Sequence, residues 1–261
     1  MHPYLIHYGP ILLPTFGVLT AAGLMAALSL SLRTAKLVRI DPDALWNAGL
    51  FTILSALVLS RLLLIAANFH SFLSYPLTIL ALSSLNDTGI LLTLIATVVY
   101  LRFKGLPLLS ALDAWAPCAT LTWAFLALGH LAEGSDPGLP SSLPWSILSP
   151  TGGARLHPVA LYVALVAALI TVAVYRYLQQ HPEPGRPAAL ALILAGLAQF
   201  LLSFLRHPSF DSDISPLFNV LDPLQWVSLG MIVVATTLLL QSTPIKAEQQ
   251  TSDQIQEHHA L

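Results

Sequence analysis

Three arginines in this sequence are candidates for binding a phosphate group. Arg61 lies inside a long apolar run, Arg155 lies in a segment rich in Gly, Pro and Ser, and Arg206 directly follows another apolar run. A guanidinium presents a planar fork of N–H donors that matches phosphate geometry. Arg61 could instead extend its charge to the membrane surface. The three arginines therefore suggest contacts to a lipid phosphate.

Two histidines and one aspartate are candidates for proton transfer. His130 stands near the end of one apolar run and His157 just before the next, so the two could meet, and either could be a base. Asp87 could be a base or an orienting carboxylate, or simply the cap of the helix that follows it. The hydroxyl of Tyr162 needs a partner, although Tyr162 could equally be an interfacial aromatic residue.

Other classes of site are disfavoured. No HxxxH pair falls on an expected helix, which argues against zinc, and no cofactor is indicated. Cys118 is the single cysteine, so an internal disulfide is impossible, and we expect it to be a core residue. The net charge of −2 provides no basic excess for binding nucleic acid.

The composition indicates a membrane protein. The chain is 56% hydrophobic and only 9% charged, against about 25% charged in an ordinary soluble domain. A spanning helix needs about 20 mainly apolar residues. Because these runs are too long for barrel strands, we predict an all-α bundle of seven transmembrane helices. The expected spans are 12–32, 44–67, 85–103, 109–131, 159–177, 188–205 and 224–240.

The third expected span is the weakest, because its continuous apolar block covers only residues 90–101. We expect a short interfacial helix before it, at residues 76–82. The long connection at 132–158 is rich in Gly, Pro and Ser, and long irregular loops are often functional.

The basic residues predict the orientation, because short cytoplasmic loops retain Lys and Arg. With the N-terminus outside and the C-terminus cytoplasmic, only Arg155 and Arg206 fall in outer loops. We expect a monomer with a transmembrane domain at 1–240 and a disordered, polar cytoplasmic tail at 241–261. The basic residues on the predicted inner side are Arg33, Lys36, Arg39, Arg102, Lys104, Arg176, Arg186 and Lys246.

Over most of its length the sequence resembles the bacterial prolipoprotein diacylglyceryl transferases, which are seven-span inner-membrane enzymes. The most specific signals are a DxxAP motif at 113–117 and an HPxxLY motif at 157–162. The other matching segments are Gly9-Pro10, Phe16-Gly17, Ser60-Arg61, Leu128-Gly129, Gly134, Leu143-Pro144-Trp145 and Phe204-Leu205-Arg206-His207-Pro208, the last resembling the family's FFRxP.

The resemblance implies transfer of diacylglycerol from phosphatidylglycerol to the lipobox cysteine thiol of a prolipoprotein, with release of glycerol phosphate. Its implied partners are phosphatidylglycerol and the signal-peptide region of the prolipoprotein, at the outer leaflet of the inner membrane. Such a reaction needs a base to form the thiolate and cations around the leaving phosphate. The candidate bases are Asp87, His130 and His157, and the candidate phosphate ligands are Arg61, Arg155, Arg206 and Tyr162.

Several positions of the family's motifs carry other residues in this chain, when the motifs are aligned without gaps from Asp113. Two possibilities follow: a transferase with a rearranged site, or a family member that binds phospholipid or a partner protein without catalysis. A small transporter is a third class, but the sequence shows no internal repeat. The replacements are Asp87 for the histidine of HGG, Ala127 and His130 for the arginine and asparagine of RxGNxxNGE, Val163 for the glutamate of HPxxLYE, and Ala195 and Gln199 for the tyrosine and arginine before FFRxP.

Overall fold

The computed structural model describes residues 4–8, 11–69, 87–136, 138–148, 153–206 and 221–242. The described residues form a mostly helical fold with seven helices and four short strands. The helices are α1 (Thr15–Leu37), α2 (Pro42–Ala67), α4 (Asp87–Phe103), α5 (Leu108–Glu133), α6 (Val159–Leu178), α7 (Arg186–Ser203) and α8 (Pro223–Ser242). The strands are β1 (Tyr4–Tyr8), β2 (Ile11–Pro14), β3 (Ile147–Leu148) and β4 (Arg155–Leu156).

Six of the helices are long and apolar enough to cross a bilayer, so the chain is a multi-pass membrane protein. The seventh, α4, has 17 residues and corresponds to the third expected span. The short helix expected at 76–82 and the tail from residue 243 onward lie outside the described residues. Helix α8 continues to Ser242, two residues beyond the expected end of the transmembrane domain.

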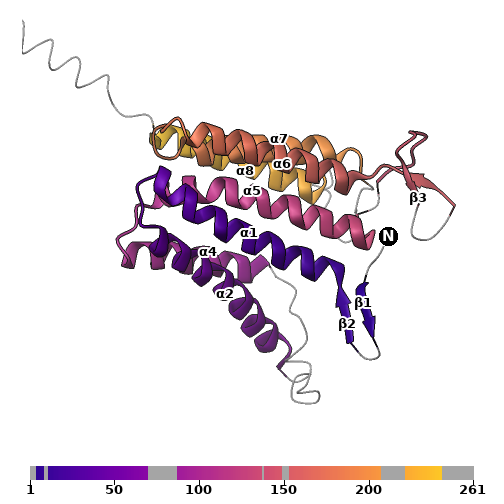
Figure 1. Ribbon diagram of the computed structural model, residues 1–261, viewed down its shortest axis with the longest axis horizontal. Helices are drawn as coiled ribbons and strands as arrows, with labels where there is room; N and C mark the ends of the chain where they lie inside the picture. Colours follow the sequence, from indigo (N-terminus) through magenta and orange to yellow (C-terminus); the bar gives the residue numbers. More distant parts are fainter. Residues whose placement is uncertain are drawn as a thin grey trace, which may run out of the picture.

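The helices lie side by side, and α5 is at the centre of the bundle (Figure 1). It packs against α1 on one side and against α6 and α7 on the other, while α8 packs on α7 and α2 pairs with α4. Half of the most apolar stretch of α5 is buried, against 6% of the corresponding stretch of α2. Helix α5 is therefore the core of the protein, whereas α2 turns most of its surface to lipid.

Small residues allow α5 to approach its neighbours closely. An added Cβ at Gly129 would lie 2.6 Å from Cδ2 of Phe16, and Gly23 of α1 similarly accommodates Phe125 of α5. Close backbone approach at small residues is the usual way in which membrane helices associate. Cys118 is buried in this helix, as expected for a core residue.

The four strands lie at one end of the bundle, which we call the hairpin end (Figure 1). There β1 pairs antiparallel with β2, and β3 pairs antiparallel with β4. Helix α1 begins at Thr15, three residues later than the expected span, because residues 11–14 belong to β2. The strands are an addition to the expected helical bundle. Strands β3 and β4 have two residues each in a Gly- and Pro-rich segment, which leaves no periodic pattern to detect.

Candidate functional site

A cavity of about 280 Å³ lies at the hairpin end, among α5, α6 and α7. We call it the hairpin-end cavity. Its wall combines aliphatic side chains with the ionisable groups of three residues from the end of α5, the loop that follows it and the end of α7. The lining residues are Trp123, Leu126, Ala127, His130, Ser135, Asp136, Val163, Gln199 and Arg206.

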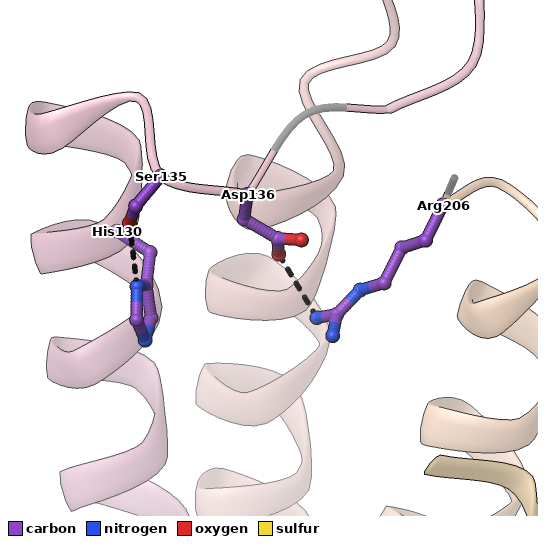
Figure 2. Close-up of polar contacts among 4 residues, drawn as sticks. All are labelled: His130, Ser135, Asp136 and Arg206. Carbon is purple, nitrogen blue, oxygen red and sulfur yellow. Dashed lines mark hydrogen bonds and ion pairs between the residues drawn. The ribbon is translucent and has the colours of Figure 1, made fainter. Parts of the chain in front are cut away.

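His130 is oriented by a hydrogen bond to Ser135. The Nδ1 atom of His130 lies 2.8 Å from the Oγ atom of Ser135, as Figure 2 shows. Gly134 makes this contact possible, because its left-handed backbone (φ 72°) ends α5 and turns the chain back toward the last helical turn. The Phe16 ring packs on the other side of the imidazole, with 4.9 Å between the ring centroids. Within the described ranges, no hydrogen bond to the Nε2 atom of His130 is seen.

Arg206 forms an ion pair with Asp136 across the same cavity. The Nη2 atom of Arg206 lies 3.0 Å from Oδ2 of Asp136, and the two side chains are 19% and 18% exposed (Figure 2). The Nε atom of Arg206 is buried and has no hydrogen-bond partner among the described residues. Asp136 therefore largely neutralises the charge of Arg206 at the cavity wall, while the Nε–H of Arg206 can still donate a hydrogen bond.

A strip of paired backbone at residues 138–141 fixes the position of Arg206. Gly138 pairs with Arg206 as an antiparallel bridge, and the N–H of Leu139 donates to the carbonyl oxygen of Leu205 at 2.8 Å. On the strip's other edge, the N–H of His157 donates to the carbonyl oxygen of Leu139 at 3.0 Å. Gly138 is required there, because an added Cβ would collide with the carbonyl oxygen of His157. The strip thus joins the loop after α5 to the start of α6 and the end of α7.

His157 and Tyr162 lie beside this strip and do not line the hairpin-end cavity. The two rings meet edge to face, with 6.3 Å between their centroids. The Tyr162 hydroxyl accepts a hydrogen bond of 2.8 Å from Nε1 of Trp145, which supplies the partner that the sequence analysis called for. The Nδ1 atom of His157 is buried without a hydrogen-bond partner in the part of the chain that the structure describes.

The other three predicted site residues also lie away from the hairpin-end cavity. Arg61 is half-buried on α2, Arg155 is exposed on β4, and Asp87 is exposed in the first turn of α4. Of the seven residues proposed from the sequence, the structure brings His130 and Arg206 together on one cavity. No group of three or more His, Cys, Asp and Glu residues that could hold a metal ion occurs within the described ranges.

Sequence reasoning missed three polar residues of the cavity as site residues: Ser135, Asp136 and Gln199. Gln199 carried a usable signal, because it is an amide inside an apolar span, where polar groups are costly. Ser135 and Asp136 follow Gly134 in a polar loop, where nothing in the sequence alone distinguishes them.

Most of the positions at which the chain departs from the family's motifs lie around this cavity. Ala127, His130, Val163 and Gln199 all line it, and so does Ser135, which stands at the final glutamate of the RxGNxxNGE pattern. Although Asp87 and Ala195 do not line the cavity, most of the replacements therefore alter one place in the molecule. They leave it less charged than the family's pattern would.

Comparison with known proteins agrees with the motifs. The sequence profile described as "Prolipoprotein diacylglyceryl transferase" matches residues 3–241. Three proteins named phosphatidylglycerol–prolipoprotein diacylglyceryl transferase illustrate the relatives. The protein of Bordetella avium is 29% identical over 175 residues, which is 65% of this chain and 66% of the relative, just under two thirds.

Two further relatives match over nearly the whole chain. The protein of Agrobacterium fabrum is 24% identical over 264 residues, covering 91% of this chain and 89% of the relative. That of Photobacterium profundum is 25% identical over 266 residues, covering 96% of each chain. Since the profile covers most of the sequence, the chain belongs to the prolipoprotein diacylglyceryl transferase family.

Proposed function

We propose that this protein transfers diacylglycerol from phosphatidylglycerol to the lipobox cysteine thiol of a prolipoprotein. The observation that carries the proposal is that His130 and Arg206, a candidate base and a candidate phosphate ligand, line the same cavity. The names of the relatives support the choice of both substrates. No cofactor is needed for this reaction, because it exchanges one carbon–oxygen bond for one carbon–sulfur bond.

We place the hairpin end at the outer face of the bacterial inner membrane. The opposite end carries most of the described basic residues, among them Arg39, Lys104 and Arg186, as expected of a cytoplasmic face. Helix α4 completes seven crossings in this proposal. Its 17 residues extend over about 25 Å, close to the hydrocarbon thickness of about 30 Å.

His130 would accept the thiol proton. If Nδ1–H of His130 donates to Oγ of Ser135, then Nε2 carries a lone pair and can take the proton from the cysteine sulfur. The thiolate then forms a bond to the terminal glycerol carbon of the diacylglycerol unit. The bond from that carbon to the phosphate oxygen breaks, and its electron pair leaves with glycerol phosphate. The proton remains on His130 until the product departs.

Arg206 would stabilise the leaving phosphate. A guanidinium beside a developing negative charge lowers the barrier most when water is excluded, and Arg206 is four-fifths buried. The remaining candidates would act outside the cavity, around the rest of the lipid and the peptide. They are Asp87 and His157 as alternative bases, and Arg61, Arg155 and Tyr162 as further phosphate contacts.

The test is transfer by the purified full chain in phosphatidylglycerol vesicles, with a synthetic lipobox peptide as acceptor. Mass spectrometry should detect the peptide with a thioether-linked diacylglycerol. The product should be lost in His130→Ala and Arg206→Ala and retained in Arg176→Ala, which changes an exposed arginine at the opposite end. A folded wild-type protein that forms no thioether product would refute the proposal.

A second candidate function is lipid binding without transfer. It is favoured by the aliphatic side chains of Ala127 and Val163, which line the cavity where the family's motifs have arginine and glutamate. In that case phosphatidylglycerol would co-purify with the protein, and the vesicle assay would give no product. The double variant Ala127→Arg/Val163→Glu would then be expected to gain transfer activity.

A further inference from the structure

Two buried polar groups of the hairpin-end cavity have no hydrogen-bond partner among the described residues. They are the Oε1 atom of Gln199, near the end of α7, and the Nε atom of Arg206, beyond it. Buried polar groups in native proteins are normally satisfied, and an orphaned one calls for a water or a ligand. Because both groups line one cavity, a single ligand could satisfy both.

The hydrogen-bonding character of the wall defines the ligand's chemistry. The Gln199 amide offers both an acceptor and donors, and the carboxylate of Asp136 has acceptor capacity beyond its one contact to Arg206. A phosphodiester oxygen only accepts, and an ammonium group only donates. A hydroxyl group does both, so hydroxyls next to a phosphate would satisfy Gln199, Asp136 and Arg206 together.

The charge of the cavity wall also favours a hydroxylated headgroup. Arg206 and Asp136 are 3.0 Å apart and offset each other. An ammonium headgroup attracted to Asp136 would also approach the guanidinium, which is of like charge. A phosphomonoester would bring its extra negative charge beside Asp136. A neutral hydroxylated group beyond the phosphate meets neither penalty.

The cavity is large enough to hold a glycerophosphate headgroup. At roughly 30 Å³ per water-sized group, 280 Å³ holds about nine groups. A glycerophosphate has about ten non-hydrogen atoms, and because bonded atoms each occupy less volume than a water molecule, the cavity can hold it. A hydrocarbon tail in the cavity would leave the Gln199 amide oxygen and the Arg206 Nε atom without partners.

We propose that Gln199 and Asp136 recognise the hydroxyl groups of a glycerophosphate headgroup while Arg206 contacts its phosphate, so that this cavity selects the lipid by its headgroup. The inference rests on the proposed phospholipid donor. It assigns specificity to Gln199, which stands where the family's pattern has an arginine, and to Asp136, which follows the RxGNxxNGE pattern. It also explains how a cavity with so little net charge can distinguish one phospholipid from another.

The experiment compares lipids that differ only in the headgroup. Dioctanoyl phosphatidylglycerol, phosphatidylethanolamine and phosphatidic acid are titrated into the full chain in detergent, and binding is measured by microscale thermophoresis. We expect phosphatidylglycerol to bind at least tenfold more tightly than either of the others. Gln199→Leu and Asp136→Asn should each remove this preference, mainly by weakening phosphatidylglycerol binding. Free glycerol phosphate should compete only weakly if the anchored lipid is the ligand, and strongly if the detached headgroup is.

The matched control is Gln180→Leu, the same chemical change at an exposed position in the turn after α6. It should keep the wild-type preference. Equal binding of the three lipids by the wild type, or an unchanged preference in both cavity variants, overturns the inference. The two proposals can fail separately. Selective binding without a thioether product would support headgroup recognition and refute transfer. Transfer without selective binding would support the proposed function and refute headgroup recognition.

Discussion

The carboxylate of Asp113 binds the first turn of a helix that begins 73 residues later in the chain. Its oxygens accept hydrogen bonds from the backbone N–H groups of Gly185, at 2.6 Å, and Ala188, at 2.9 Å. These groups would otherwise be unsatisfied donors at the N-terminus of α7. Asp113 lies on α5, so the contact fixes the core helix against the helix that carries Gln199. It also gives a structural reason for the aspartate of the DxxAP motif.

Replacement of Asp113 by alanine should destabilise the protein by about 2 kcal/mol, because two buried donors lose a charged acceptor. Asp113→Asn, which retains one acceptor oxygen, should lose less. Thermal unfolding of the purified protein in detergent measures both. Asp41→Ala removes an exposed cap at the N-terminus of α2 and is the control, with a smaller expected loss. Equal losses for the buried and exposed caps would contradict this account.

Arg206→Lys should reduce the proposed transfer almost as much as Arg206→Met does, by about 100-fold or more, because a lysine lacks the planar fork of donors. Initial rates in phosphatidylglycerol vesicles provide the measurement. The unfolding midpoint of the lysine variant should change far less than the rate, because a lysine keeps a positive charge that can pair with Asp136. Full activity of the lysine variant would show that charge alone suffices.

Ser135→Ala should lower the kcat of the proposed transfer about tenfold and leave KM unchanged, because Ser135 positions the base without contacting the substrate. Ser135→Thr keeps the hydroxyl and should restore most of the activity. A merely structural role would instead lower the amount of folded enzyme and leave kcat per folded molecule intact. Rates normalised to folded protein therefore decide between the two.

Alanine substitutions at two glycines should have opposite effects. Gly129→Ala would push its Cβ against Phe16, the residue that packs on His130, and should destabilise the protein by about 1–3 kcal/mol. Gly230→Ala in α8 meets nothing within 4 Å and should be neutral, or stabilising by up to about 1 kcal/mol. Unfolding midpoints of the two variants test this, and a shared sign would exclude the packing explanation.

Much of the helical framework could be predicted from the sequence, because long apolar runs have no other stable structure in a bilayer. The weakest expected span became α4, which has 17 residues. Hydropathy alone predicts the start of α1 three residues too early, because residues 11–13 of β2 are as apolar as the helix that follows them.

The composition of the candidate site was harder to predict, because its residues meet only after folding. Asp136 and Arg206 are 70 positions apart, and the backbone bridge between Gly138 and Arg206 spans nearly as far. Arg206 could be proposed from its charge beside an apolar run. Asp136 could not, since an aspartate after a glycine turn in a polar loop is ordinary.

The backbone strip at residues 138–141 links the loop after α5 directly to Arg206. Hydrogen bonds of the main chain, unlike those of side chains, transmit a pull without any change of rotamer. A polypeptide that binds this loop and displaces it would also displace the guanidinium of Arg206. Movement of the loop after α5 and movement of Arg206 are therefore coupled through the main chain.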